Sequence, residues 1–268
     1  MIDAHVHLWQ LGCNGCSWPT SELEPIHRNF SLQDLSDVIG SSGTDQVILV
    51  QSQEDKADTS WLLSIADDPM ISGVVGWADL LEPDCAAEIS ELASDGRLLG
   101  LRPMVQDREA DWYDQSKIDE PLSAMATFEL VLDALVRPQH LKSLSRLALR
   151  HPELAIVIDH GAKPQFPDIE HWSEDIRLIA RCQNVYCKLS GLLTELPRGD
   201  PASLALIFEQ LWNAFGAERL VWGSDWPVLM LAASYQDWLD QCLRLVASAH
   251  QDAVFDFNAR RIYGLKSS

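Results

Sequence analysis

Short apolar runs alternate with amphipathic stretches along the whole chain. The apolar runs are expected to form β-strands, and they cover residues 2–8, 46–51, 73–78, 98–105, 128–132, 154–159, 185–189 and 219–223. Between these runs, apolar residues recur at spacings of three and four, which is typical of helices with one buried face. Strands that alternate with amphipathic helices favour a parallel sheet with the helices packed on its outside.

Capping residues support the helix predictions. Ser31 is expected to cap the helix that carries Leu32 and Leu35, and Asp200 with Pro201 provides the cap and first turn of another helix. Further helices are expected near residues 59–67, 83–92, 121–126, 138–149, 172–181, 235–249 and 253–263.

Eight strand–helix units in 268 residues match the usual size of a (β/α)8 barrel. We therefore predict an α/β protein that forms a single TIM-barrel domain over residues 1–268. A doubly wound open sheet is the alternative fold for such a pattern. It is disfavoured because no glycine-rich phosphate-binding fingerprint follows the first strand.

The formal net charge of −20 limits the partners that this chain is expected to bind. An acidic surface repels nucleic-acid phosphate and anionic membranes, so a small-molecule substrate is the favoured partner. No apolar run in the sequence reaches the length of a membrane span, and residues 1–5 resemble the start of a folded strand rather than an export signal. We therefore expect a soluble cytoplasmic protein, whose oligomeric state the sequence leaves open.

Six cysteines are scattered over the chain, which needs no disulfide scaffold at this length. Cys13 and Cys16 have the C-x-x-C spacing. A zinc ribbon requires a second such pair, and a redox pair normally opens a helix after a strand. These two cysteines lie among Gly, Asn, Trp and Pro, so an ordinary loop is the favoured interpretation and a thiol-redox role is the alternative.

His5 and His7 are the most specific chemical feature of the sequence. Residues two apart on a strand face the same way, so Asp3, His5 and His7 are expected on one side, toward the interior of the barrel. Two neighbouring imidazoles are not expected to be charged together, and a metal ion or a shared polar ligand would resolve this. An H-x-H pair also occurs by chance on ordinary strands, so the pair by itself does not decide between these interpretations.

Two other strand ends carry polar groups that are suited to catalysis. His160 follows the sixth predicted strand, and Asp225 follows the eighth. Catalytic residues of barrel enzymes lie at the carboxyl ends of the strands. A loop histidine and a helix cap are the alternative roles for these two residues. Because strands one and eight are neighbours in a closed barrel, we expect both residues to join the histidine pair in one site.

Four sequence blocks, together with the C-terminal segment, resemble the amidohydrolase superfamily. They are DAHVHLW (residues 3–9), DHGAKP (159–164), CKLSGL (187–192), WGSDWP (222–227) and NARRIY (258–263). The nearest branch is the amidohydrolase 2 group, which holds sugar lactonases of the L-fuconolactonase and L-rhamnonolactonase type as well as muconolactone- and pyrone-type lactonases. The resemblance spans nearly the whole chain and implies a TIM-barrel hydrolase.

The resemblance also implies roles for residues at the strand ends. Those that would hold a metal ion or polarise a carbonyl group are His5, His7, His160 and Asp225. Asp225 would be the base that activates water, with His160 as a second catalytic residue. Two-metal members of the superfamily have a carboxylated lysine on strand four and a histidine after strand five, where this chain has Arg102 and Asp133. The resemblance therefore implies at most one divalent ion, with zinc as the first choice, or a mechanism without an ion.

Substrate contacts are expected from side chains at or just beyond the strand ends. They are Trp9, Gln51, Arg102, Lys163, Lys188 and Trp226. The three cations could bind a carboxylate or hydroxyl groups, and the two tryptophans could stack on a sugar ring. A structural role is the alternative for each of them. The histidines expected to be non-catalytic are His27, His140, His151, His171 and His250.

The reaction that the resemblance implies is the opening of a lactone ring, in the first place that of a sugar lactone. Asp225 would activate the water, and the histidines, with or without an ion, would stabilise the oxyanion. A metal-dependent decarboxylase or another amidohydrolase of the same superfamily is the alternative enzyme. A non-catalytic binding barrel is the alternative class of protein.

Overall fold

The computed structural model describes residues 1–40, 42–196 and 200–265, and within them eight parallel strands form one sheet in chain order. The strands are β1 (Ile2–Val6), β2 (Gln46–Val50), β3 (Ile71–Gly76), β4 (Leu98–Leu101), β5 (Val131–Ala134), β6 (Ile156–Ile158), β7 (Val185–Leu189) and β8 (Leu220–Trp222). Val6 also pairs with Trp226, just beyond β8, where the amide of His7 donates to the Trp226 carbonyl at 2.8 Å. The sheet therefore closes into a barrel, and the predicted (β/α)8 fold is confirmed.

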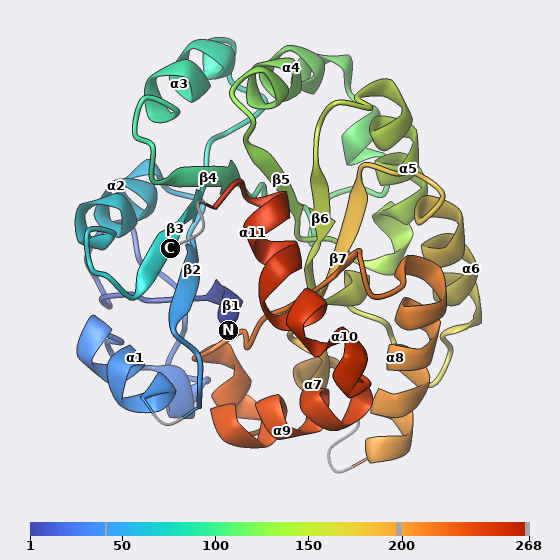
Figure 1. Cartoon of the computed structure of the whole chain (residues 1–268). Coiled ribbons are helices and arrows are strands. Elements are labelled where there is room, and N and C mark those ends of the chain that lie inside the picture. The colour runs from blue at the N-terminus through green and yellow to red at the C-terminus, as the bar shows by residue number, and fades with distance from the viewer. Residues whose placement is uncertain (41, 197–199, 266–268) are drawn as a thin grey trace.

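Helices cover the outside and one end of this barrel (Figure 1). They are α1 (Leu32–Ile39), α2 (Lys56–Ile65), α3 (Cys85–Leu92), α4 (Asp119–Thr127), α5 (Leu141–Arg150), α6 (Glu170–Ile179), α7 (Leu192–Glu195), α8 (Pro201–Phe215), α9 (Tyr235–Leu245), α10 (Ser248–Asp252) and α11 (Asn258–Ile262). Both predicted caps are confirmed, since the Ser31 hydroxyl accepts from the amide of Asp34 and the Asp200 carboxylate accepts from the amides of Ala202 and Ser203.

Two apolar layers stabilise the barrel. The larger layer lies between the strands and the outer helices. The smaller layer joins alternate residues of the strands to the C-terminal segment, and it consists of Ile2, Ala4, Ile48, Val50, Val75, Val131, Val157, Val221, Ala259, Ile262 and Tyr263. Each fully buried aliphatic side chain of this kind contributes about 1.5–3 kcal/mol. The amino-terminal end of the barrel is thus closed by apolar packing, with α11 lying across it (Figure 1).

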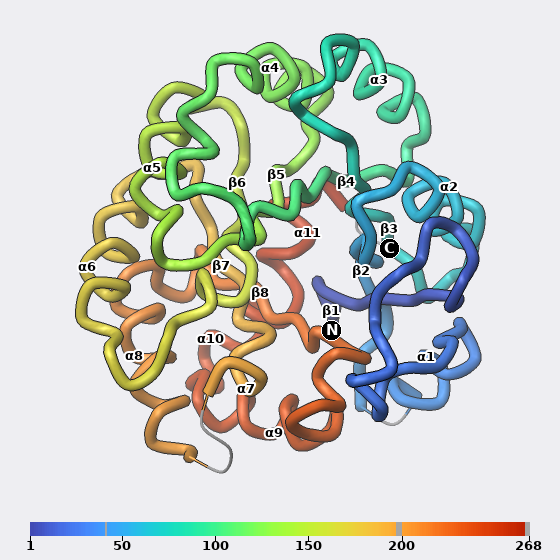
Figure 2. Tube along the Cα trace, turned by 180° about the vertical axis from the view of Figure 1, so that it is seen from behind, coloured from blue at the N-terminus to red at the C-terminus, as the bar shows by residue number. Residues whose placement is uncertain are grey.

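The carboxyl end of the barrel carries the longer connections. Figure 2 views the barrel from that side and shows the segments after β1 and after β4 running around the opening. The Cys13–Cys16 turn belongs to the first of these segments, where the amide of Cys16 donates to the Cys13 carbonyl at 2.8 Å. Both thiols are free, with Cys13 exposed and Cys16 buried. The sequence-based expectation of a loop at this position is confirmed.

Two strand boundaries differ from the prediction by three residues or more. β4 ends at Leu101 instead of Val105, because Pro103 has no N–H to donate to a neighbouring strand. β5 begins at Val131 instead of Phe128, because Phe128 still belongs to the end of α4 and Glu129 has a left-handed backbone with φ of 57°. As a result, Asp133 lies inside β5 and is fully buried, whereas the sequence placed it just after the strand.

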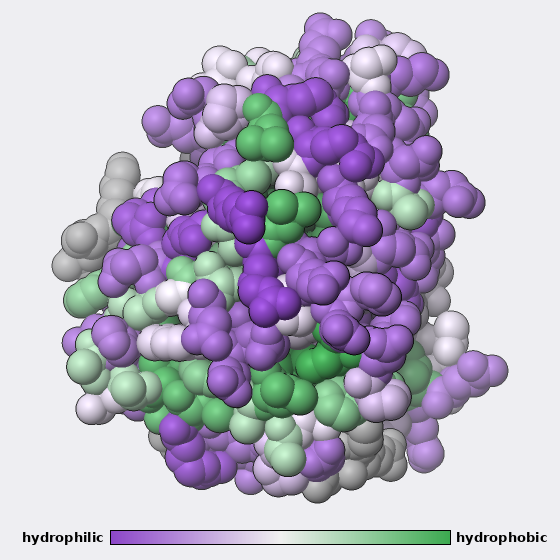
Figure 3. Space-filling view, turned by 90° about the vertical axis from the view of Figure 1, so that its right-hand side faces the viewer, coloured by the Kyte–Doolittle hydropathy of each residue, from purple (hydrophilic) through white to green (hydrophobic). Residues whose placement is uncertain are grey.

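The side of the molecule that carries α5, α6 and α8 is mainly hydrophilic, with smaller apolar areas between the polar side chains (Figure 3). The exposed large apolar residues on these three helices are Leu149, Leu178 and Leu206. None of the helices within the described ranges combines the length and apolar character that crossing a membrane requires.

Candidate active site

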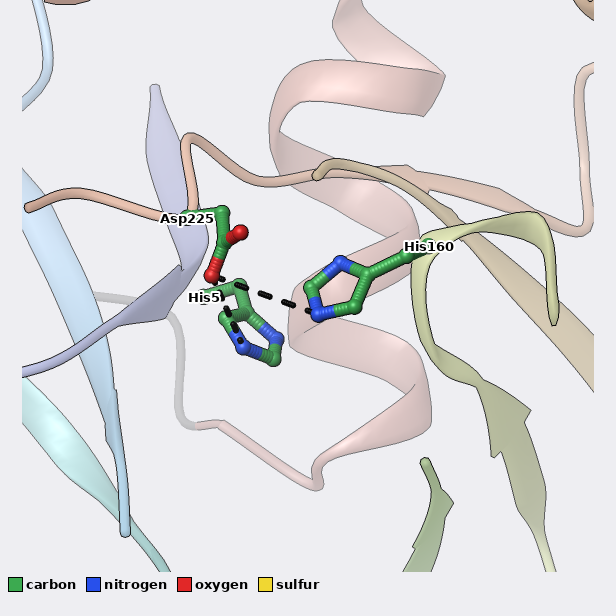
Figure 4. A group of neighbouring side chains, drawn as sticks. All are labelled: His5, His160 and Asp225. Carbon is green, nitrogen blue, oxygen red and sulfur yellow. Dashed lines mark ion pairs between the residues drawn. The ribbon is translucent and has the colours of Figure 1, made fainter. Parts of the chain in front are cut away.

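The carboxyl ends of β1, β6 and β8 bring four predicted residues together. His5 lies on β1 and His7 directly follows it, while His160 follows β6 and Asp225 follows β8. Figure 4 shows the side chains of His5, His160 and Asp225 pointing toward one another from these three segments. All four side chains are buried. The four side chains therefore lie close together, as expected for residues at the ends of the neighbouring strands one and eight and of strand six.

Asp3 does not share the face of His5 and His7, which corrects the expectation from the sequence. Its carboxylate accepts hydrogen bonds from the amides of His5 and Ser224, and from the hydroxyl of Tyr235 on the outer helix α9. The pairing of β1 with β2 changes register between Asp3 and Val6. Such an irregularity breaks the alternation of side chains along a strand, so Asp3 anchors α9 and the segment after β8 instead of facing the site.

Both His160 and Asp225 adopt a left-handed backbone, with φ of 53° and 61°. This conformation costs a non-glycine residue about 1–2 kcal/mol, and such residues gather at functional sites where the surroundings enforce them. Gly191 provides the space for the His160 ring, because a β-carbon at this position would lie 2.4 Å from Nδ1 of His160. That nitrogen is hydrogen-bonded to the hydroxyl of Ser190 at 2.9 Å. The CKLSGL block thus fixes the orientation of His160.

Burial and close contact shift the pKa values of these groups downward. Burial lowers the pKa of His160 to about 4 and holds the pKa of His5 well below its usual range, so both imidazoles are neutral at neutral pH. Burial alone would raise the pKa of Asp225, but the adjacent His160 and the hydrogen bond to His7 outweigh burial and lower it. Asp225 is therefore ionised at neutral pH and lies beside neutral imidazoles.

The spacing of the side chains fits one small divalent ion. Nε2 of His5 and Nε2 of His7 are 3.1 Å apart, and they lie 3.6 and 3.3 Å from Oδ1 of Asp225. Tetrahedral zinc, with bonds of about 2.0–2.2 Å, places its ligands about 3.3–3.6 Å apart. Nε2 of His160 is 4.0 Å from the same carboxylate oxygen. Imidazole nitrogen and carboxylate oxygen are both donors that zinc accepts, so this set of residues is suited to such an ion.

A network of buried charges lies beneath these residues. Lys188 forms ion pairs with Asp133 and with Oδ1 of Asp159 at 3.1 Å, and its ammonium lies 3.2 Å from Nδ1 of His5. The side chains of Lys188, Asp133 and Asp159 have no solvent exposure. His5, Asp133 and Asp159 are close enough to form a second group of potential metal ligands, but the ammonium of Lys188 lies among them.

A pocket of about 680 Å³ opens above the four residues. Its lining includes His7, His160 and Asp225, together with Arg102 and Lys163 from the predicted substrate contacts. Nε of Arg102 is buried and has no hydrogen-bond partner among the described residues. A buried guanidinium N–H at a pocket wall that lacks an acceptor is suited to donate a hydrogen bond to an oxygen atom of a ligand.

The other predicted substrate contacts do not line this pocket. Trp9 and Trp226 are buried in the apolar layer, where each ring packs against Phe30. Gln51 is buried and donates from its side chain to the Arg102 carbonyl at 2.8 Å. Lys188 lies in the buried charge network. These four side chains lie outside the lining of the pocket and pack beneath or beside it, and their contact with a substrate stays a prediction.

Several residues of the pocket were missed by the sequence reasoning. They are Gly15, Ser17, Trp18, Ser52, Gln53, Glu54, Asp55, Met104, Gln106, Asp107, Leu135, Arg137 and Val228. Most lie in loops after β1, β2, β4 and β5, where no periodic pattern marks a position as facing the opening. Their positions just after predicted strands could have been used to place them at the carboxyl end of the barrel. Such positions do not indicate which of these residues face the pocket.

A closed barrel whose polar residues gather at the carboxyl ends of the strands defines a TIM-barrel enzyme architecture. The model of the amidohydrolase family matches residues 2–265. The chain belongs to this family.

Individual relatives cover almost the whole chain. The L-fucono-1,5-lactonase of Burkholderia ambifaria is 40% identical over 274 residues, which include 98% of this chain and 94% of the relative. The L-fucono-1,5-lactonase of Burkholderia multivorans is 30% identical over 288 residues, covering 98% of this chain and 96% of the relative. A crystal structure of an amidohydrolase from Burkholderia multivorans with bound zinc has a TM-score of 0.91 at 28% identity, with 99% of both chains covered.

Proposed function

We propose that this chain hydrolyses a sugar lactone to the corresponding open-chain acid. The observation that carries this proposal is the ionised Asp225 beside His5, His7 and His160 at the floor of a polar pocket. Two relatives that are named L-fucono-1,5-lactonases, and that align over 98% of the chain, support this substrate class. L-Fucono-1,5-lactone is therefore the first compound to test.

Asp225 acts as the general base in this proposal. Its carboxylate accepts a proton from a water molecule as the oxygen attacks the lactone carbonyl, and then returns the proton to the ring oxygen that leaves. Because its pKa is lowered, the carboxylate of Asp225 is ionised and can accept a proton from water, but it is only a weak base. The reaction therefore needs help in stabilising the attacking hydroxide and the oxyanion.

The imidazoles would stabilise the oxyanion, and a single divalent ion held at this site would add to that stabilisation. His160 lies at the pocket wall, and together with His5, His7 and Asp225 it would hold the ion. When bound, the ion would raise the acidity of water and polarise the carbonyl. Zinc is the proposed ion, and a second ion is disfavoured because the ammonium of Lys188 lies within the second ligand group.

Arg102 and Lys163 are proposed to bind hydroxyl groups of the substrate. Both line the pocket, and the Nε of Arg102 can donate a hydrogen bond for which the described residues supply no acceptor. The ammonium of Lys163 is partly engaged by Glu195 at 3.3 Å, which leaves it two further donors. Residues 1–268 are proposed to act as one domain. A cytoplasmic location, and the exclusion of nucleic acid and membranes as partners, stay predictions.

A pH-indicator assay over a panel of aldonolactones tests the function. Fresh protein is expected to open at least one of them, and parallel reactions with a chelator report whether an ion is required. Replacing Asp225 with Asn is expected to lower kcat by about 10²–10⁴-fold without changing the thermal midpoint, since general base catalysis contributes that factor. Failure to open any lactone would sink the proposal, and release of CO₂ from an aromatic acid would favour the decarboxylase alternative.

A further inference from the structure

Trp18 lines the pocket but was not among the predicted substrate contacts. It lies in the segment after β1 that runs along the opening (Figure 2), and it is half-buried. Its ring packs edge to face against Trp9, with the ring centroids 5.4 Å apart. Trp9 packs in the same way against Phe30, and Phe30 against Trp226. Trp18 is therefore the pocket end of a row of four aromatic rings whose other three members are buried.

The backbone of Trp18 is fixed by the buried side chain of Gln53. Oε1 of Gln53 accepts from the amide of Trp18 at 3.2 Å, and Nε2 of Gln53 donates to the Trp18 carbonyl at 2.8 Å. The thiol of Cys16 donates to the same carbonyl at 3.2 Å. The edge-to-face contact with Trp9 occupies at most one face of the Trp18 ring. The ring thus presents surface to the pocket from a position set in advance, and it loses little conformational freedom when a ligand binds.

A sugar lactone has two kinds of surface that match this part of the pocket. Its hydroxyl groups project around the ring, where Arg102 and Lys163 are proposed to bind them. Its C–H groups form the faces of the ring, and such apolar faces pack well against an aromatic side chain. After hydrolysis the chain is open, and its hydroxyl and C–H groups no longer separate into an edge and two faces. An aromatic ring in the pocket therefore favours the closed form.

We propose that Trp18 is a substrate-binding residue that packs against the C–H face of the lactone ring and makes the site selective for the closed ring over the open chain. The contact involves none of the bonds that change in the reaction. It therefore strengthens the binding of the substrate and of the transition state alike. This inference rests on the sugar-lactone substrate of the proposed function.

The binding of two neutral sugars without turnover tests the ring selectivity. L-Fucose is a closed pyranose with no lactone bond to hydrolyse, and L-fucitol is the open chain obtained by its reduction. Both are titrated into the protein by isothermal titration calorimetry. Trp18→Ala is expected to weaken the binding of L-fucose about tenfold and that of L-fucitol by less than about threefold. Equal weakening of both ligands, or no binding of L-fucose to the wild type, would overturn the proposal.

Two further variants separate ring contact from a general effect on the fold. Trp212→Ala is the matched control, because Trp212 is also half-buried but lies on α8 and does not line the pocket. It should leave both affinities unchanged. Trp18→Leu keeps apolar volume without a flat ring, so it should lose the preference for L-fucose as well. It replaces Trp18→Ala if that variant does not fold.

Lactone hydrolysis separates this inference from the proposed function. With L-fucono-1,5-lactone, Trp18→Ala should raise KM about tenfold and leave kcat within about twofold, because a contact made equally in the substrate complex and the transition state changes binding only. A tenfold loss of kcat at unchanged KM would contradict the proposed role. If Trp18 gives the wild type its preference for L-fucose but no lactone is opened, the proposed function fails and the ring contact stands.

Discussion

Gly191 is predicted to be indispensable for the geometry of His160. A β-carbon at Gly191 would lie 2.4 Å from Nδ1 and 2.6 Å from Cγ of the His160 ring, and the residue has a φ of +60°. In Gly191→Ala the backbone conformation costs about 1–2 kcal/mol. The ring must also move, which breaks its hydrogen bond to Ser190 and costs about 0.5–1.5 kcal/mol more. We expect a total loss of about 1.5–3.5 kcal/mol in the free energy of unfolding.

The effect on catalysis is expected to exceed the effect on stability. A catalytic group displaced by about 1 Å can cost a factor of about 10² in rate, which corresponds to about 2.8 kcal/mol. Gly264→Ala is the matched control, because Gly264 has a φ of +62° and a β-carbon added there would meet no atom within 4 Å. It should show the backbone penalty alone and keep the wild-type kcat/KM. The measurements are urea unfolding and lactone hydrolysis, and equal stability and activity of the two variants would refute the reasoning.

Three further predictions address the buried polar groups and the loop after β1. Burial raises the pKa of Asp3 to about 6, so the folded state binds a proton on the Asp3 carboxyl group more tightly than the unfolded state does. The folded state therefore loses stability as the pH rises from about 4 to 6 and this proton dissociates. Relative to Asp3→Asn, the wild type should lose up to about 3 kcal/mol across that window in urea unfolding, and parallel pH profiles would contradict this. Tyr263→Phe leaves Oδ1 of Asp133 without its donor and should lower the free energy of unfolding by about 1–3 kcal/mol, so an unchanged urea midpoint would rule this out. Gln53 accepts from the amides of Ser17 and Trp18 and donates to the Trp18 carbonyl at 2.8 Å, so Gln53→Ala should raise KM by about tenfold with kcat nearly unchanged, and a selective loss of kcat would show a different role.

The strand–helix alternation and the residues at three strand ends could be predicted from local patterns. Periodicity and capping depend on neighbours in the sequence, and for that reason the caps at Ser31 and Asp200 agree with the structure. The proximity of His5, His160 and Asp225 followed from a rule of barrel architecture, which holds for any sequence that forms this fold. The four sequence blocks indicated the family, which the match over residues 2–265 shows.

Other features depended on contacts between residues far apart in the chain, and no local pattern contains them. The register change in β1 directs Asp3 toward Tyr235 on α9, which is 232 positions away in the sequence. Lys188 has the same sequence context whether it faces a substrate or a buried aspartate, and only the barrel interior places it beneath His5. The sequence by itself thus determined which groups gather at the carboxyl end of the barrel. The tertiary structure decided which of them face the pocket, because burial and pairing of charges depend on neighbours from other strands.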